Sequence, residues 1–256
     1  MQSIPAPCCR SAINFCCVAC AWLATAVATS AYAGNPGYDR PGLGFSPAVL
    51  EAGDFTWEQG LPDWSRADGA SLYTADTLLR LGVGGPFELQ LGTSYNHLAA
   101  PGVDAWGRGD SSVGLKFALP ATGDFRWGLL GSVTFTDGAR DFRDQDRQYT
   151  LGAVFNWQTG PRGAIGAYLE TARSGGRNGN LVALNAGRAL TGSLDTYVEV
   201  AWQHAAGIGD GSMAGAGLAW AVTPRMQLDA SFRHRLGGAA DTWEAGFGVS
   251  VYFGRP

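Results

Sequence analysis

The chain has 256 residues, of which 46% are hydrophobic and 16% are charged, and its formal net charge at pH 7 is −4. Lys116 is the only lysine in the sequence, so the chain lacks the clustered positive charge that a nucleic-acid-binding surface needs. We therefore exclude nucleic acid as a partner. After the first 33 residues, about 220 residues remain, which suits a single domain.

The first 33 residues predict a secretory signal peptide. Arg10 is their only charged residue, residues 12–28 are mostly apolar, and Ala31-Tyr32-Ala33 supplies small residues for cleavage. The alternative is a membrane anchor helix, but the apolar run is shorter than the roughly 20 residues that cross a bilayer. All the cysteines lie in this segment, at Cys8, Cys9, Cys16, Cys17 and Cys20. The mature chain would have none, which excludes disulfides, CxxC redox pairs and thiolate metal sites.

The remaining chain alternates apolar side chains with polar or small ones. In residues 242–253 every second residue, from Trp243 to Phe253, is aromatic, aliphatic or alanine, and the residues between them are polar or small. Successive side chains of a strand point to opposite faces of a sheet. The pattern recurs about a dozen times in segments of roughly ten residues, which is typical of a barrel whose outside meets lipid. The sequence therefore predicts an all-β fold, a transmembrane antiparallel up-and-down β-barrel.

In chain order, the pattern predicts a loose periplasmic lead-in over residues 34–47 and a barrel of about twelve strands over residues 48–256. The strands are expected at residues 49–59, 71–83, 87–97, 109–119, 125–136, 148–158, 163–172, 180–190, 194–204, 213–222, 226–236 and 242–253. Connections after even-numbered strands are tight, and those after odd-numbered strands are mostly longer and more polar. Outer-membrane barrels have short periplasmic turns and longer outer loops, so we expect both termini in the periplasm.

The aromatic residues of the apolar parity predict two membrane girdles. One is expected near the outer strand ends and the other near the inner ends, as amphipathic rings at the two membrane interfaces would require. The outer girdle contains Trp57, Tyr95, Trp202 and Trp243, and the inner girdle contains Trp127, Trp157, Trp220 and Phe253. A soluble barrel would have no reason to sort its aromatics this way. We therefore expect the bacterial outer membrane, with its lipid and lipopolysaccharide, as the surroundings of the barrel.

The opposite parity carries charged residues that would line the lumen. The candidate lumen-lining residues are Glu88, Lys116, Arg126, Glu170, Asp195, Glu199, Asp229, Arg233 and Glu244. They predict a mixed-charge pore that sets solute preference. The alternative is a network of ion pairs that fills the barrel, because twelve strands lie between the side-chain-filled barrels of eight and the open channels of sixteen or more.

The sequence predicts no catalytic, cofactor or metal site. A hydrolase would place a histidine beside a serine hydroxyl, but His97, His204 and His234 lack the His-x-Ser spacing of outer-membrane lipid hydrolases. Their parity points them toward lipid, so we interpret them as rim residues near lipid headgroups. A hydrolase with a Ser–His pair across strands stays as the third hypothesis. The charged run 137–147 alternates in sign, which favours a solvated outer loop paired within itself over a divalent-ion site or a lipopolysaccharide phosphate site.

Two segments resemble a known family. The stretch from Trp106 to Phe117, with its Gly-x-Gly-Asp and Gly-x-Lys-aromatic spacing, and the stretch from Thr223 to Asp229 are similar to the outer-membrane barrels grouped as the MetA pathway of phenol degradation. This resemblance implies a non-enzymatic transporter in a Gram-negative bacterium, with a porin-like lumen that passes a small solute, aromatic or hydrophobic solutes included. The alternative is a structural or surface-interaction barrel with a plugged lumen.

The final strand also resembles the signal that the barrel assembly machinery recognises. Gly248, Val251 and Phe253 have the expected spacing. The chain departs from that signal after the terminal aromatic, where Gly254-Arg255-Pro256 follows. The resemblance implies the barrel assembly machinery as a partner during folding.

Overall fold

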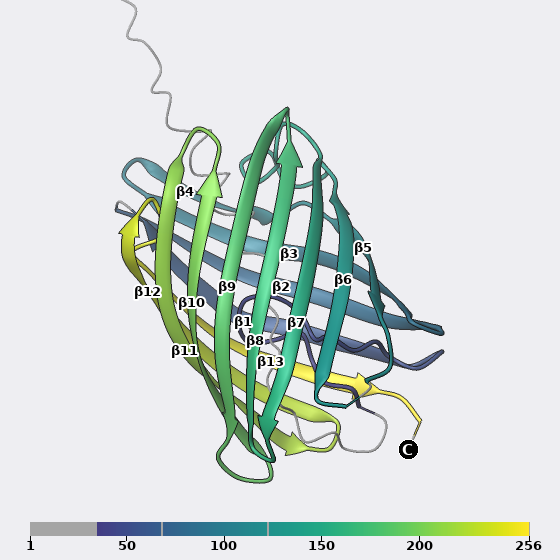
Figure 1. The fold of residues 1–256 in the computed structure, drawn as a ribbon. Helices are drawn as coiled ribbons and strands as arrows, with labels where there is room; N and C mark the ends of the chain where they lie inside the picture. Colours follow the sequence, from purple (N-terminus) through teal and green to yellow (C-terminus); the bar gives the residue numbers. More distant parts are fainter. Residues whose placement is uncertain (1–34, 68, 122, 256) are drawn as a thin grey trace, which may run out of the picture.

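The strands of the chain form one antiparallel sheet that closes on itself (Figure 1). The computed structural model describes residues 35–67, 69–121 and 123–255, and the predicted signal peptide lies outside these residues. The strands are β1 (Phe55–Ala67), β2 (Ala70–Gly84), β3 (Phe87–Ala100), β4 (Val103–Arg108), β5 (Ser112–Ala118), β6 (Phe125–Thr134), β7 (Gln148–Gly160), β8 (Gly163–Ser174), β9 (Arg177–Ala189), β10 (Leu194–Ala205), β11 (Gly209–Thr223), β12 (Met226–Gly238) and β13 (Trp243–Phe253). No helix among the described residues is long and apolar enough to cross a membrane.

The sheet has twelve positions around its circumference. β1 pairs with both β2 and β13, which closes the barrel. β4 and β5 both pair with β3, at its later and earlier residues respectively, so they share one position. The break between them falls at Gly109, where a Cβ would lie 2.2 Å from the Ser94 Oγ atom. The predicted twelve-stranded barrel is therefore confirmed, although its fourth strand is interrupted rather than beginning at Gly109.

The predicted alternation of side chains is also confirmed. On β13, Phe247 is 62% exposed on the outside, whereas its neighbours along the strand turn small or polar groups inward, and Ser250 is fully buried. The same parity holds on β3, where Glu88 and Gln90 are buried and Leu91 is exposed. A polar interior and an apolar exterior reverse the arrangement of a soluble core, which suits a barrel in lipid.

The first strand is where the prediction fails. We expected a strand at residues 49–59 and then a loop, but β1 begins at Phe55 and runs to Ala67, with an irregular register between Gly60 and Asp63. An irregularity of this kind shifts the alternation and tolerates the proline at position 62, so the period-two signal is lost there. Because β1 begins only at Phe55, Trp57 lies near the start of the strand, at the same end of the barrel as Phe253, and not in the outer girdle.

We call the end of the barrel that carries Phe253 and the turn at Gly85 the terminal end, and the end that carries residues 135–147 the loop end. Most strands extend further toward the loop end than expected, so that β3 and β4, and likewise β8 and β9, are joined by tight turns. Residues 135–147 form the one long connection among the described residues at this end. The alternation of short and long connections is therefore weaker than the sequence predicted.

The segment before β1 lies inside the barrel. We expected residues 34–47 to be a loose periplasmic lead-in, but residues 37–46 are buried. Figure 1 shows this purple segment coiled within the ring of strands. We call residues 35–50 the plug segment.

Candidate functional site in the barrel lumen

The plug segment enters and leaves the lumen at the terminal end. Near its start, the Tyr38 hydroxyl donates to the Arg225 carbonyl oxygen at 2.7 Å, in the turn between β11 and β12. After its end, the Gly53 amide donates to the Gly82 carbonyl oxygen of β2 at 2.9 Å. Gly37, Gly42 and Gly44 have positive φ angles of 104°, 131° and 101°, which glycine adopts without a steric penalty. The segment can therefore reverse its direction within the narrow lumen.

Carboxylates of the barrel wall accept the amides of the plug segment. A buried backbone N–H needs a partner, and apart from a single bridge residue at Gly44 the plug segment forms no strand whose ladder could supply one. Glu58 accepts the amides of Asp39 and Arg40, each at 2.9 Å. Further along the segment, the Leu43 amide donates to the Glu199 carboxylate and the Leu50 amide to the Glu88 carboxylate, at 3.0 Å in both pairs. The wall thus binds the main chain of the segment as well as its side chains.

Asp39 lies at the centre of the first charged cluster. Its carboxylate accepts the Lys116 ammonium at 3.0 Å and the Gln90 amide at 2.7 Å, and it lies 3.3 Å from the Arg80 guanidinium. Arg80 also binds both oxygens of the Glu88 carboxylate, at 2.7 and 3.0 Å. Arg80, Glu88 and Lys116 are completely buried. A buried charge is tolerated when it is paired and hydrogen-bonded, so each of these groups depends on the others.

Arg40 lies at the centre of the second cluster. Its guanidinium binds both oxygens of the Asp63 carboxylate, at 2.8 and 2.9 Å, and it lies 3.1 Å from the Asp76 carboxylate and 3.4 Å from that of Asp229. Two-pronged contacts of this kind are among the stronger hydrogen bonds in proteins. Arg40 thus places one cation among three carboxylates. Its carbonyl oxygen also accepts the side-chain amide of Gln227 at 3.0 Å.

A third cluster lies further along the lumen, on β10, β12 and β13. The Arg233 guanidinium donates to the Glu199 carboxylate at 2.6 Å and to the Glu244 carboxylate at 3.1 Å. Glu199 is the group that also accepts the Leu43 amide. This cluster therefore joins the plug segment to the β10 side of the barrel.

The lumen wall formed by β6 to β11 is mainly apolar and faces Leu43 and Phe45 of the plug segment. These two residues belong to one buried cluster with wall residues of those strands, and the wall members are Leu130, Val154, Tyr168, Leu181, Ala183, Ala201 and Met213. Phe45 and Tyr168 pack edge to face, with their ring centroids 5.8 Å apart. We call this side the apolar wall, and we call the side formed by β1 to β5, β12 and β13, with Glu199, the charged wall.

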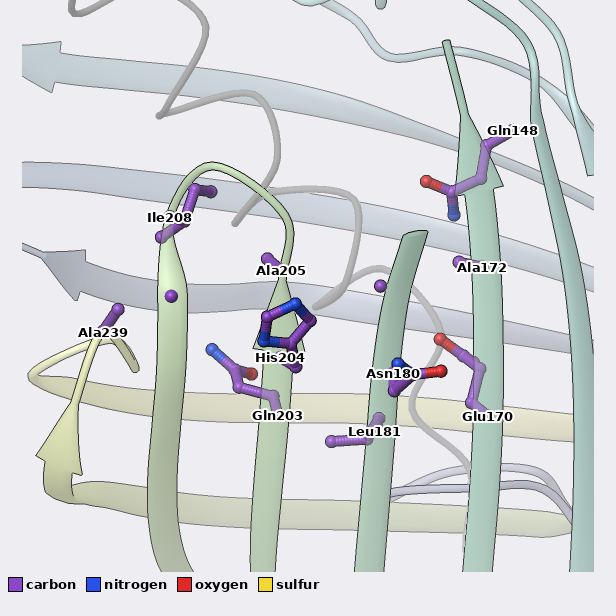
Figure 2. A pocket seen from close by; sticks show the side chains of 12 residues that line it. Gln148, Glu170, Ala172, Asn180, Leu181, Gln203, His204, Ala205, Ile208 and Ala239 are labelled. Carbon is purple, nitrogen blue, oxygen red and sulfur yellow. The ribbon is translucent and has the colours of Figure 1, made fainter. Parts of the chain in front are cut away.

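A pocket lies toward each end of the lumen. The pocket at the loop end is lined by residues of β7 to β11 and by Ala239, and Figure 2 shows Glu170, Leu181, Gln203 and His204 around it. The pocket at the terminal end is lined by Asn35, Tyr38 and Asp195, together with the turns at residues 192–193 and 223–224. The two pockets therefore lie toward opposite ends of the lumen, and described residues of the plug segment line the one at the terminal end.

The structure places the nine predicted lumen-lining residues in different surroundings. Six belong to the three charged clusters, namely Glu88, Lys116, Glu199, Asp229, Arg233 and Glu244. Glu170 accepts the Tyr168 hydroxyl and lines the loop-end pocket. Asp195 lines the terminal-end pocket. Arg126 shares the inward parity of the buried Asn156 but is exposed near the terminal end, so it lies outside the three clusters.

Sequence reasoning missed the residues of the plug segment. Asp39 and Arg40 are the centres of two clusters, yet they lie in a stretch rich in glycine and proline that carries no strand signal. Asp63 was assigned to a loop and instead holds Arg40. One available signal was the pair of opposite charges at positions 39 and 40, in a segment that otherwise carries none before Glu51.

The predicted girdle residues lie on the outside of the barrel. Trp57, Tyr95, Trp157, Trp202, Trp220 and Phe253 are exposed, while Trp127 and Trp243 are partly buried. At the loop end, Trp64 takes the place expected for Trp57, since its ring stacks on Tyr73 with centroids 5.0 Å apart and packs against Trp243 at 4.5 Å. The contact of these rings with a membrane interface remains a prediction.

The histidines lie at the loop end. His97 Nε2 is 3.1 Å from an Asp104 carboxylate oxygen, and His204 Nδ1 is 2.7 Å from one of Asp210. His234 Nδ1 is 2.7 Å from the Arg235 carbonyl oxygen. None of these contacts is the Ser–His pair that the hydrolase hypothesis requires. Among the described residues, no group of three or more His, Cys, Asp or Glu side chains is arranged to hold a metal ion.

The long loop at residues 135–147 is bound to the strand beside it as well as to itself. The Asp137 carboxylate accepts the Ser111 amide at 2.8 Å, and this contact, together with Arg108, lowers the pKa of Asp137. The Asp110 carboxylate accepts the amides of Gly138 and Asp144. Burial, together with the neighbouring Asp110 charge, raises the pKa of Asp144 to about 6. The expected pairing within the run is therefore incomplete, because residues 108–111 supply several of the partners.

Comparison with known proteins identifies one matching family. Residues 38–253 match the model of the family described as "Putative MetA-pathway of phenol degradation". No curated protein matches the chain. Among solved structures, the chain is similar to an outer membrane channel from Pseudomonas putida F1, with 12% sequence identity, a TM-score of 0.65, and coverage of 84% of this chain and 99% of that one. It is also similar to the KdgM porin, with 9% identity, a TM-score of 0.56, and coverage of 78% and 99%. These structural likenesses support the fold.

Proposed function

The chain belongs to the MetA-pathway of phenol degradation family of outer-membrane barrels, and on that premise we propose that it passes a small solute through its lumen, driven by the solute gradient alone. Passage requires the plug segment to move. The observation that carries this proposal is the position of that segment, which lies between a pocket at each end of the lumen. The proteins with similar folds are described as a channel and as porins, which supports a passive, non-enzymatic role.

The plug segment is suited to move without unfolding the barrel. Its contacts with the wall are hydrogen bonds, ion pairs and apolar packing, and it contributes no residue to the barrel strands. The barrel closes where β1 pairs with β13, and both strands come after the plug segment in the sequence. Displacing residues 35–50 therefore leaves every inter-strand hydrogen bond in place.

The charges of the lumen argue against an anionic solute. The carboxylates outnumber the basic groups in each of the three clusters when Glu58, which lies 2.9 Å from the Arg80 guanidinium, is counted with the first. The excess is largest around Arg40, where Asp63, Asp76 and Asp229 surround one guanidinium. Like charges repel strongly where water is scarce. We therefore infer that neutral and cationic solutes pass more readily than anions of the same size.

A swelling assay tests the proposal. Liposomes would carry either the unaltered barrel or a variant that lacks residues 35–47, and each solute would be added outside. We expect the variant to admit small neutral solutes several-fold faster, because the lumen loses its central obstruction. Arg126→Ala is the matched control, since it removes an inward-parity arginine that lies outside the clusters and should leave the rate unchanged.

The second candidate is a structural or surface-interaction barrel whose lumen stays closed. The specific observation that favours it is the complete burial of Arg80, Glu88 and Lys116 in one paired network. If the deletion variant folds, as shown by its heat-modifiable migration in gels, but remains as impermeable as the unaltered barrel, passive transport is contradicted and this second function is supported.

A further inference from the structure

The apolar wall contains a hollow beneath the Phe45 ring. Two neighbouring rows of inward residues cross β6, β7 and β8, and register places Gly128 beside Val154 and Tyr168 in one row, and Leu130 beside Gly152 and Glu170 in the next. The two glycines therefore lie diagonally, each beside a bulkier residue. Such an arrangement leaves a depression in an otherwise filled surface, because a glycine has no side chain to occupy its place.

The Phe45 ring fills this hollow closely. A Cβ added at Gly128 would lie 3.4 Å from Phe45 Cε2, and one added at Gly152 would lie 3.2 Å from Phe45 Cε1. The Tyr168 ring meets the Phe45 ring edge to face, at an interplanar angle of 84°. The Lys116 ammonium lies over the ring, 5.7 Å from its centroid, which is within the range of a cation–π contact. The hollow thus offers a six-membered aromatic ring an apolar floor, an edge contact and a cation.

The hollow adjoins the pocket at the loop end. Glu170 lines that pocket and accepts the hydroxyl of Tyr168, the residue that touches Phe45. Leu181 belongs both to the lining of the pocket and to the buried cluster that contains Phe45. A molecule in the pocket is therefore separated from the Phe45 ring by the Tyr168 side chain and its neighbours.

We propose that the hollow over Gly128 and Gly152 is a binding site for an uncharged, single-ring aromatic solute, and that Phe45 is its occupant within the same chain. This inference rests on the proposed function. A solute ring that enters from the loop-end pocket competes with Phe45 for the hollow. Once Phe45 is displaced, the plug segment loses its main apolar contact and is held by the charged wall alone.

The chemistry around the hollow selects the solute. Glu170 is the direct cross-strand neighbour of Gly152, and Glu88 is that of Lys116. Lys116 is already paired with the Asp39 and Glu88 carboxylates, so it offers an anionic ring no free counter-charge. A saturated ring of the same size could fill the space, but it would lose the edge-to-face and cation–π contacts that require a π system.

Fluorobenzene and fluorocyclohexane, observed by ¹⁹F NMR, test the site. The Phe45→Ala variant in detergent should bind fluorobenzene more tightly than fluorocyclohexane, by several-fold. The matched variant F45A/G152V fills the hollow with a side chain and should lose this preference. Equal binding of both rings, or equal binding by both variants, would overturn the assignment, because either result describes partition into an apolar phase and not a site.

A second measurement uses the chain with Phe45 in place. A cysteine at position 46, made by Ser46→Cys, would report the exposure of the plug segment to a membrane-impermeant maleimide. Fluorobenzene should raise the labelling rate several-fold, while fluorocyclohexane at the same concentration should not. An unchanged rate with fluorobenzene would overturn the competition.

The two proposals can fail separately. If deletion of residues 35–47 opens the barrel but fluorobenzene neither binds to F45A nor speeds labelling, the ring site is wrong and passive transport stands. If the deletion leaves the barrel closed, passive transport is wrong whatever fluorobenzene binds.

Discussion

The charged wall and the apolar wall of the lumen hold the same segment by different means. The charged wall binds the main chain of the plug segment, through the amides that Glu58, Glu88 and Glu199 accept. The apolar wall packs against the side chains of Leu43 and Phe45. Charge-assisted hydrogen bonds are directional and depend on position, whereas apolar packing tolerates sliding and exchange. The first wall therefore fixes where the segment lies, and the second can accept a substitute for it.

The largest expected effect breaks the charged wall at Arg40. Arg40→Ala leaves Asp63, Asp76 and Asp229 together without their cation, and loss of one partner of a buried ion pair costs about 3–5 kcal/mol. We expect the plug segment to leave the lumen and ion conductance in planar bilayers to rise strongly. Arg126→Ala should leave conductance unchanged. If Arg40→Ala conducts no more than the unaltered barrel, the charged wall does not hold the segment in place.

The next effect tests which side of the sheet forms these walls. Leu89 lies between Leu81 and Leu115 on the outer face, next to the inward residues Glu88 and Gln90. Leu89→Arg should impair insertion into lipid vesicles by about 2–4 kcal/mol if the site lies near the bilayer midplane. Leu89→Ala is the control and should insert normally. Normal insertion of the arginine variant would mean that the assignment of β3 side chains to the lipid and lumen faces is shifted by one residue.

A smaller effect is expected on the apolar wall. Leu43→Ala removes buried packing, and a buried leucine typically contributes about 2 kcal/mol or more over alanine. The Leu43 amide should still donate to Glu199, because the main chain is unchanged. We therefore predict a modest rise in conductance, well below that of Arg40→Ala. A rise as large as that of Arg40→Ala would show that the apolar wall is an equal partner in holding the segment.

Ion preference should depend on how deeply a basic residue lies in the lumen. Lys116 is fully buried between two carboxylates, whereas Arg126 is exposed near the terminal end. Removing either charge should shift the reversal potential toward cations, with Lys116→Gln giving the larger shift and Arg126→Gln the smaller. Measurement in the background that lacks residues 35–47 separates preference from plugging. Equal shifts, or a shift toward anions, would contradict the assigned positions.

The smallest effect lies outside both walls, at Asp144 of the long loop. Because burial raises the pKa of Asp144 from its ordinary value of 3.8 to about 6, the folded loop binds the proton more tightly than the unfolded chain does. The packing of the loop is therefore strongest below about pH 4 and weakens as the pH rises to about 6. Hydrogen exchange of residues 138–144, corrected for intrinsic rates, should increase over this interval. Asp144→Asn should remove the pH dependence, and its persistence would point to another group.

The sequence was sufficient to predict the barrel but not its contents. Alternation along strands such as β3 and β13 follows directly from the geometry of a sheet between lipid and lumen, and it gave the facing of Leu89 and Glu88 correctly. It failed at β1, which begins at Phe55 and therefore places Trp57 at the terminal end, and in which the irregularity after Gly60 shifts the parity of the residues that follow. A search for strict alternation cannot detect a strand in which one extra residue interrupts the alternation.

The plug segment could not be predicted for a different reason. Arg40 contacts Asp63 and Asp76, which are close in sequence, but also Asp229, and Leu43 contacts Glu199. No local pattern encodes such long-range contacts of an irregular segment. The alternation correctly predicted that Glu88, Lys116 and Arg233 face the lumen. It could not distinguish charges that line a water-filled pore from carboxylates that bind the backbone amides of the plug segment.

The most direct test of the account is the accessibility of residue 46. All native cysteines lie in the first 33 residues, so Ser46→Cys would give the predicted mature chain a single thiol, at a site that is 5% exposed. We predict that a membrane-impermeant maleimide labels this thiol much more slowly than one at the exposed position 124, made by Asp124→Cys, and that adding Arg40→Ala removes most of the difference. Equal labelling of positions 46 and 124 in the otherwise unaltered barrel would contradict a plug segment inside the lumen.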